Sequence, residues 1–499
     1  MTGHVTERGL TSSVRAGCKQ RNVVYPELGR VGTGRSCWSP ADPVRYAIIV
    51  TTESEPGLEF SQLLPFGTRM RSKMAALFVL LVLVLLLLLQ RFSSSSYRPP
   101  PHRPASHRTG PDRPGSSEGD GLQYGVMFDA GSTGTRVHVF RFQMENPGFP
   151  SLDRETFRAI EPGLSAYADD PQKCSAGIVV LLDLARSVVP PSQWTRTPVV
   201  LKATAGLRLL PGDKAEQLLD RVRALFQESP FLSTEDSVSI MDGTDEGISA
   251  WITINFLTGG LQGLDRPTVG MLDLGGGSTQ ITFSPRHEKT IQTSPINDIR
   301  SFQMFNRTHT VYTHSYLGLG LLSARLAVLG GVDVPPSGGS TERVSPCLAP
   351  GFSGNWEHAD VVYTLKGQKE GEPVYEACLN KVQKVLYRKL SAAPEAADVD
   401  FYAFSFYYDR AVDLQAIDEA AGGTIRVSDY GQAAERVCRG PPDLQNPFLC
   451  LDLVYISVLL QELGFPAHKQ LRLARTVRQV EASWALGAIF QHLEALRRR

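Results

Sequence analysis

The chain has 499 residues, with 51 basic and 51 acidic side chains and therefore a formal charge of zero. This length allows two or three domains with large buried cores. A neutral chain has no global electrostatic field to attract nucleic acid, so we expect no nucleic-acid partner. Hydrophobic residues make up 42% of the chain and charged residues 20%, which fits a globular enzyme.

A nearly pure aliphatic run lies between Met74 and Leu89, with basic residues just before it. It is shorter than the roughly 20 apolar residues of a typical membrane-spanning helix, but its leucine content and basic flank compensate in part. Because basic residues stay on the cytosolic side, the chain after residue 90 should enter the lumen. We predict a membrane-retained signal anchor over residues 74–90, with a cleaved secretory signal as the alternative. Residues 1–73 then form a cytosolic or non-native extension.

Residues 91–121 are rich in Pro, Ser, Gly and Arg and cannot bury a core, so they are predicted to form a stalk. Five of the seven cysteines follow the anchor, and none has the C-x-x-C spacing of a zinc site. The simplest pairing joins neighbours in sequence and leaves Cys174 free. These pairs are Cys347 with Cys378 and Cys438 with Cys450. Asn306 begins the tripeptide Asn-Arg-Thr, a predicted N-glycosylation site.

One pattern occurs twice in the body: an apolar strand, an aspartate, a glycine-rich turn with Ser and Thr, and a second strand. In the first copy, Asp129 follows a strand over 124–128; in the second, Asp273 follows a strand over 268–272. Glycines let backbone N–H groups approach a phosphate, and hydroxyl groups add donors. Two copies about 140 residues apart predict two similar lobes that each contribute a phosphate-binding hairpin to a shared cleft.

Strands and helices alternate in the rest of the body, as in layered α/β folds. We expect strands over 199–203 and 237–241 and helices over 248–258 and 481–497. The predicted lobe I comprises residues 122–250 and 475–499, and the predicted lobe II comprises residues 251–474.

The aspartates that head the two turns, Asp129 and Asp273, are candidates for organising a divalent cation. Facing carboxylates beside a phosphate attract a hard cation, Ca²⁺ or Mg²⁺, partly through water. The simpler alternative is that each aspartate only caps its turn. Hydrolysis also needs a base that deprotonates water, and Glu246 is the candidate at a strand-to-helix turn. Asp245 is its neighbouring competitor, and a glutamate placed there by the helix dipole alone is the structural alternative.

Five blocks, in order along the body, resemble the five apyrase conserved regions of the ectonucleoside triphosphate diphosphohydrolase family. They are DAGSTGTR (129–136), KATAGLR (202–208), DGTDEGISAWITIN (242–255), LDLGGGSTQI (272–281) and SWALG (483–487). The resemblance covers nearly all of the body after residue 122. It implies the two-lobed α/β fold of the actin, sugar kinase and heat-shock chaperone superfamily. Each lobe of that fold is ribonuclease-H-like, and the active site lies in the cleft between the lobes.

The resemblance also implies residue roles. Glu246 resembles the general base, Ser278 and Gln280 resemble the groups that hold the attacking water, and Asp129 and Asp273 resemble the residues that organise the hydrated metal. Phosphate contacts are implied for Ser132, Thr133, Gly134, Thr204, Ala205, Gly276 and Gly277. Tyr408 and Trp484 resemble residues near the nucleobase, and burial in the core is the alternative for these aromatic side chains.

The chain is similar to the single-anchor or soluble branch of this family, because it has few cysteines and ends in Leu496 followed by three arginines. That branch implies a Golgi membrane protein with its body in the lumen, or a secreted or cell-surface form. It implies hydrolysis of nucleoside diphosphates (GDP, IDP and UDP) in preference to triphosphates. We expect a monomer. An exopolyphosphatase-like hydrolase and a non-catalytic actin-like nucleotide-binding module are the alternatives.

Overall fold

The computed structural model describes residues 121–146, 149–263, 266–331, 340–358 and 361–498. The predicted extension and signal anchor, and all but the last residue of the predicted stalk, lie outside this part of the chain. Among the described residues, no helix combines the length and apolar character that a membrane span requires. All of the described residues belong to one compact unit.

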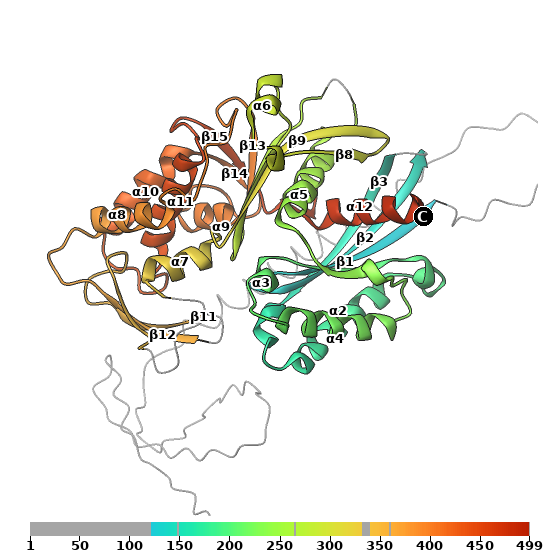
Figure 1. The fold of residues 1–499 in the computed structure, drawn as a ribbon, viewed down its shortest axis with the longest axis horizontal. Coiled ribbons are helices and arrows are strands. Elements are labelled where there is room, and N and C mark those ends of the chain that lie inside the picture. Colours follow the sequence, from blue (N-terminus) through green and yellow to red (C-terminus); the bar gives the residue numbers. More distant parts are fainter. Residues whose placement is uncertain (1–120, 147–148, 264–265, 332–339, 359–360, 499) are drawn as a thin grey trace, which may run out of the picture. The chain divides into compact units, whose positions relative to one another are not determined.

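A five-stranded sheet has the strand order β3-β2-β1-β4-β5 (Figure 1). Its strands are β1 (Leu122–Ala130), β2 (Thr135–Asn146), β3 (Phe149–Ile160), β4 (Val199–Ala203) and β5 (Val238–Ile240). β1 pairs antiparallel with β2 and parallel with β4. Alternate side chains of β1 point to opposite faces. Val126 and Phe128 enter a core formed with α2 (Cys174–Val188) and α4 (Lys214–Gln227), whereas Met127 enters the core on the other face.

A seven-stranded sheet has the strand order β14-β15-β13-β6-β7-β9-β8. Its strands are β6 (Gly270–Leu274), β7 (Ser278–Phe283), β8 (Ile299–Met304), β9 (Arg307–Leu317), β13 (Phe401–Ser405), β14 (Gly423–Arg426) and β15 (Gln470–Leu473). β6 pairs antiparallel with β7 and parallel with β13, much as β1 pairs with β2 and β4. The core on one face includes residues of α7 (Leu321–Leu329), α8 (Val374–Leu386), α9 (Phe406–Asp413), α10 (Val427–Arg439) and α11 (Leu449–Glu462).

Two helices, α5 (Gly243–Thr258) and α12 (Ala485–Arg498), pack against both sheets (Figure 1). Their core includes Met127 from β1 and Met271 from β6, so one cluster joins the helices to the two sheets. α5 is buried on nearly all sides, which explains why its sequence lacks a polar face. The helices meet at Gly487, whose N–H donates a 2.8 Å hydrogen bond to Thr253 Oγ1.

The start of α5 differs from the sequence prediction. The helix begins at Gly243, because Asp242 is its N-cap and accepts a 2.8 Å hydrogen bond from the Thr244 N–H. Glu246 therefore lies in the first helical turn. α12 begins at Ala485, four residues later than expected, because Val480–Glu481 forms the short strand β17 beside β16 (Thr476–Val477).

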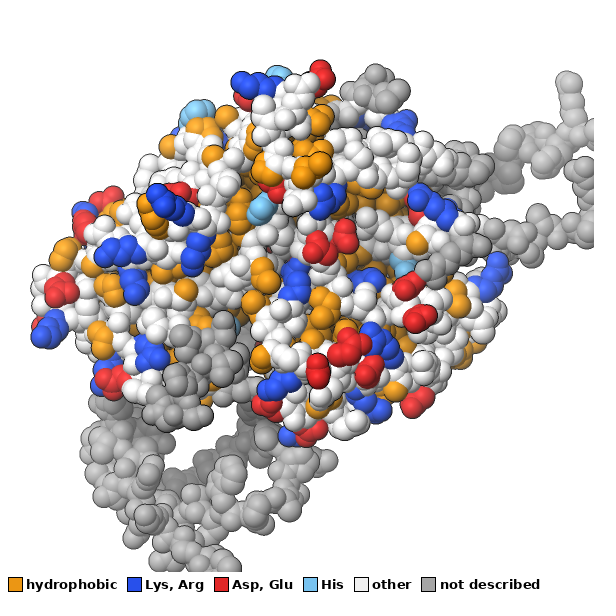
Figure 2. Space-filling view, in the orientation of Figure 1, with side chains coloured by type: hydrophobic (Ala, Val, Ile, Leu, Met, Phe, Trp, Pro, Cys, Tyr) orange, Lys and Arg blue, Asp and Glu red, His pale blue; other side chains and the backbone are white. Residues whose placement is uncertain are grey.

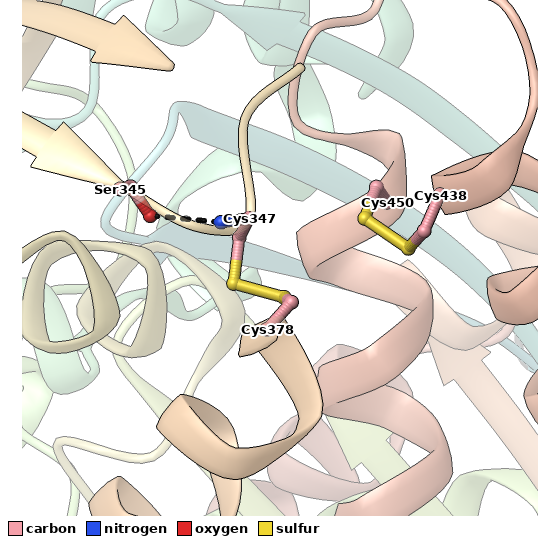
Figure 3. Close-up of a disulfide and its surroundings, with 5 residues drawn as sticks. All are labelled: Ser345, Cys347, Cys378, Cys438 and Cys450. Atoms are coloured by element: carbon pink, nitrogen blue, oxygen red, sulfur yellow. Dashed lines mark hydrogen bonds between the residues drawn. A yellow bond between two sulfur atoms is a disulfide. The ribbon is translucent and has the colours of Figure 1, made fainter. Parts of the chain in front are cut away.

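Both predicted disulfides are present (Figure 3). Cys174 is free and buried. Cys347 is joined to Cys378 of α8, and Cys438 of α10 is joined to Cys450 of α11. Cys347 follows β10 (Glu342–Ser345), which pairs with β12 (Val361–Gly367) and, through it, with β11 (Ser353–His358). The remaining short helices are α3 (Ala205–Arg208) and α6 (Glu288–Thr293).

Asn306, the predicted glycosylation site, is exposed in the tight turn between β8 and β9. It has a positive φ of 60°, a conformation that asparagine adopts more readily than most residues. Acidic and basic side chains are interspersed over the face shown in Figure 2.

Candidate active site

The two glycine-rich turns close in the same way. The Gly131 N–H donates a 3.0 Å hydrogen bond to the Gly134 carbonyl, and the Gly275 N–H donates a 3.0 Å hydrogen bond to the Ser278 carbonyl. Each turn joins two antiparallel strands, and each follows the strand that carries the aspartate. The repeat seen in the sequence therefore corresponds to two hairpins of matching geometry.

The tips of the two hairpins lie against each other. A Cβ placed on Gly276 would be 2.3 Å from Ser132 Oγ, and one placed on Gly277 would be 2.8 Å from Ala205 Cβ. A side chain at position 277 would therefore clash with Ala205, and one at position 276 would displace the Ser132 hydroxyl group. The structure thus brings together the phosphate-loop candidates of both sheets and the segment that begins at Thr204.

Asp129 and Asp273 are buried beside these turns, at 6% and 7% exposure. Burial raises the pKa of both carboxyl groups, and the charge of Asp129 further raises the pKa of Asp273. Arg136 Nη1 lies 3.2 Å from Asp129 Oδ2, and a hydrogen bond from Ser405 counteracts the raised pKa of Asp273. Among the described residues, neither Asp129 Oδ1 nor Asp273 Oδ1 has a hydrogen-bond partner. Two buried, unsatisfied carboxylate oxygens fit a hard divalent cation.

Glu246 projects from the first turn of α5 into the same region and is 7% exposed. Burial raises the pKa of its carboxyl group to about 8, although the nearby charge of Arg208 acts in the opposite direction. The charges of Asp273 and Asp129 raise this pKa as well. A raised pKa makes the ionised carboxylate a stronger acceptor for a proton from water, which suits a general base.

Ser278 and Gln280 belong to β7 and lie opposite Glu246 of α5. Gln280 Nε2 donates hydrogen bonds to Ser278 Oγ at 2.7 Å and to Ser315 Oγ at 3.1 Å. These bonds fix the amide and leave Gln280 Oε1 buried, with no hydrogen-bond partner among the described residues. Arg208 connects the two sides, since its Nη2 lies 2.5 Å from Glu246 Oε2 and 3.3 Å from Ser278 Oγ.

Four of these residues were not identified as site residues from the sequence: Arg136, Arg208, Ser315 and Ser405. Arg208 ends the KATAGLR block, and a charged residue in a short motif is a signal that could have been used. Ser315 has no distinguishing sequence signal. Ser405 has a positive φ of 54°, an unusual backbone conformation for serine, and its contact with Asp273 arises only from the pairing of β13 with β6.

A cavity of about 440 Å³ adjoins both hairpin turns. One wall is formed by Ser132, Thr133, Leu209, Leu210 and Lys214, and the facing wall by Gly276, Gly277, Leu322, Glu357 and His358. At its rim, Lys214 Nζ pairs with Asp169 Oδ1 at 2.6 Å. The two walls therefore combine apolar side chains with charged groups.

The two aromatic residues considered for the nucleobase do not contribute to the described lining of this cavity. Trp484 is 3% exposed and packs in the core around α5 and α12. Tyr408 is 4% exposed, and its hydroxyl group donates a hydrogen bond to the Glu419 carbonyl. Both side chains are thus buried in this structure.

The site therefore combines two matching glycine-rich hairpins with a buried glutamate and two buried aspartates. Residues 117–403 match the GDA1/CD39 (nucleoside phosphatase) family. The chain is 56% identical to ectonucleoside triphosphate diphosphohydrolase 6 of Mus musculus over 391 residues, which is 77% of this chain and 85% of the relative. It is 49% identical to the nucleoside diphosphate phosphatase ENTPD5 of Homo sapiens over 377 residues, or 75% of this chain and 88% of that relative.

Among solved structures, a nucleoside triphosphate hydrolase from Neospora caninum is similar in fold. Its TM-score is 0.54 at 15% sequence identity, over 76% of this chain and 93% of that one. This likeness, with the matching strand pairing in the two sheets, confirms the expected α/β fold. The chain belongs to the GDA1/CD39 family of nucleoside phosphatases and is a hydrolase.

Proposed function

We propose that this protein hydrolyses the terminal phosphate of nucleoside diphosphates, with GDP, IDP and UDP preferred over triphosphates. The products are a nucleoside monophosphate and inorganic phosphate. The observation that carries the proposal is the position of Glu246, a buried carboxylate beside Ser278, with the two hairpin turns and two further carboxylates nearby. The name of the human relative, a nucleoside diphosphate phosphatase, supports the substrate class.

In the proposed mechanism, backbone N–H groups of the two turns bind the phosphates, with hydroxyl groups of Ser132, Thr133 and Thr204. Asp129 and Asp273 would hold Ca²⁺ or Mg²⁺, which neutralises phosphate charge. Ser278 and Gln280 orient a water molecule, and Glu246 takes its proton. The water oxygen then forms a bond to phosphorus as the bond to the bridging oxygen breaks.

The nucleoside would extend into the cavity beside the turns, where Leu209 and Leu322 offer apolar surface. This placement does not require Tyr408 or Trp484 to contact the base in the conformation described here.

We place the body of the protein in the secretory lumen or outside the cell, anchored through residues 74–90 in the Golgi membrane. The two disulfides support this placement, because disulfides persist in oxidising compartments. Protease protection of the body in intact Golgi vesicles, lost on detergent treatment, tests it. Cleavage of the body in intact vesicles would contradict it.

The central test is phosphate release by wild-type protein and a Glu246→Gln variant. The panel contains GDP, IDP, UDP, GTP, ADP and polyphosphate, each with Ca²⁺, with Mg²⁺ or with a chelator. We expect the wild-type protein to release phosphate from GDP, IDP and UDP, and we expect the chelator to abolish this release. Removing a positioned base should lower kcat by at least about 10²-fold without weakening nucleotide binding.

Glu235→Gln is the matched control, because Glu235 is exposed on the surface and should leave kcat unchanged. Release from polyphosphate alone would favour an exopolyphosphatase, and nucleotide binding without release would favour a non-catalytic module. Wild-type turnover in the Glu246→Gln variant would remove Glu246 from the mechanism.

A further inference from the structure

Arg208 lies in the space where the proposed attacking water would lie. A water molecule that is held by Ser278 and deprotonated by Glu246 must contact both side chains at once. In this structure Arg208 Nη2 makes these two contacts, at 2.5 Å to Glu246 Oε2 and 3.3 Å to Ser278 Oγ. The guanidinium group therefore occupies the path between the base and the residue that holds the water.

This contact also weakens Glu246 as a base. A carboxylate that forms a charge-assisted hydrogen bond with a guanidinium group holds its negative charge more tightly and accepts a proton less readily. Arg208 must leave Glu246 before that carboxylate can take a proton from water.

A phosphate group has the chemistry to draw Arg208 away. Guanidinium binds phosphate with two parallel hydrogen bonds, and Arg208 Nε has no hydrogen-bond partner among the described residues. Arg208 ends the short helix α3, whose first residue Ala205 lies against Gly277 and whose Gly206 lies against Ser132. The arginine is thus carried by the segment that touches both phosphate turns.

Gly243 leaves room for this guanidinium group. A Cβ placed on Gly243, the first residue of α5, would lie 2.6 Å from Arg208 Nη1 and 2.2 Å from Ser315 Oγ. The glycine therefore lets the arginine reach Glu246 past the start of the helix. A larger residue there would push Arg208 away from the base.

We propose that Arg208 is a catalytic residue that caps Glu246 and Ser278 until the terminal phosphate of the substrate draws it away. Its guanidinium group then binds the oxygens of the transferred phosphoryl group, and a water molecule takes its former place. The water gives its proton to Glu246, its oxygen bonds to phosphorus, and the bond to the bridging oxygen breaks. Arg208 stays protonated throughout. This inference rests on the hydrolytic mechanism proposed above.

The test compares Arg208→Ala and Arg208→Lys with wild-type protein, with GDP and a divalent cation. By the magnitude known for arginines that stabilise a transferred phosphoryl group, we expect kcat to fall by about 10³-fold in Arg208→Ala. Guanidinium chloride at a low, non-denaturing concentration should restore part of this kcat, because it can occupy the vacated space. The kcat of Arg208→Lys should lie between those of wild type and Arg208→Ala, since an ammonium group carries the charge but not the paired donors.

Arg186→Ala is the matched control: Arg186 pairs with Asp183 on the surface of α2, and its removal should leave kcat unchanged with or without guanidinium. If Arg208→Ala retains kcat within about twofold, the inference is wrong. It is equally wrong if activity is lost and guanidinium restores none of it in a variant that melts at the wild-type temperature.

Failure of the proposed function gives a different result. In that case the wild-type protein releases no phosphate from diphosphates, or the Glu246→Gln variant remains active. If wild-type activity depends on Glu246 while Arg208→Ala stays active, only the role of Arg208 is overturned.

Discussion

At the scale of single residues, Glu246 carries a stability cost that depends on pH. Its pKa is raised from 4.5 to about 8, chiefly by burial, so the folded protein binds a proton that the unfolded chain has already lost. The free energy of unfolding therefore decreases as pH rises from about 4.5 to about 8 and changes little from this source above that range. A neutral glutamine in the same place has no such cost.

We therefore predict that Glu246→Gln raises the melting temperature, and that the gain grows with pH. Without divalent cations the variant should melt within about a degree of wild type at pH 5. It should melt several degrees higher at pH 8.5, since each pKa unit corresponds to about 1.4 kcal/mol. Calorimetry across this pH range measures the difference in melting temperature from wild type. For the control variant, Glu235→Gln, this difference should not change with pH. A gain that shrinks with rising pH would contradict the assigned burial of the charge.

Some residues of the site could be identified from the sequence, and others could not. Asp129 and Asp273 were identifiable because an apolar strand, an aspartate and glycines are consecutive in the chain. Arg208 and Ser405 were not, because their roles depend on contacts with residues 38 and 132 positions away. A sequence shows that Arg208 is charged, but only the folded structure shows that it reaches Glu246.

At the scale of elements, strand periodicity predicted the first-sheet strand at residues 199–203, which is β4. The start of α5 was missed because Asp242 is followed by residues that favour turns, and their spacing does not distinguish a turn from a capped helical turn. The contact between α5 and α12 was equally hidden. It requires a residue without a side chain at position 487, because α5 lies against this position. α5 is more than 200 residues earlier in the chain, so the sequence around Gly487 does not show the contact.

Gly487 gives a prediction at this scale. A Cβ on this residue would lie 2.0 Å from the Ser249 carbonyl oxygen, so α12 would have to move away from α5. We expect Gly487→Ala to lower the free energy of unfolding by about 1–3 kcal/mol, despite the better helix propensity of alanine. Urea unfolding measures this change. Ala495→Ser, on an exposed turn of the same helix, adds one atom without a clash and should change stability by less than about 0.5 kcal/mol.

If Gly487→Ala proved as stable as wild type, the close crossing of α5 and α12 would be wrong. That result would also weaken the site, because α5 carries Glu246 and its position against both sheets depends on this contact.

At the scale of the whole molecule, covalent cross-links are distributed unevenly. Both disulfides lie in the core beside the seven-stranded sheet, whereas the core that joins the five-stranded sheet to α2 and α4 contains only the free Cys174. The two disulfides span 31 and 12 residues. In the chain-entropy model, closing loops of these lengths stabilises the fold by roughly 3–4 kcal/mol each.

Reduction should therefore loosen one part of the molecule before the other. We expect a reducing agent to lower the melting temperature and to increase hydrogen exchange first in α8, α10 and α11, which carry three of the four bonded cysteines, while α2 and α4 stay protected. Cys174→Ser should show the same reduction-induced shift as wild type, because that thiol is in neither bond. The second hairpin belongs to the seven-stranded sheet and shares a core with α11, so activity should be lost along with protection of α11. Equal loss of protection in α2 and α11, or an unchanged melting curve, would show that the two cores do not differ in their dependence on the disulfides.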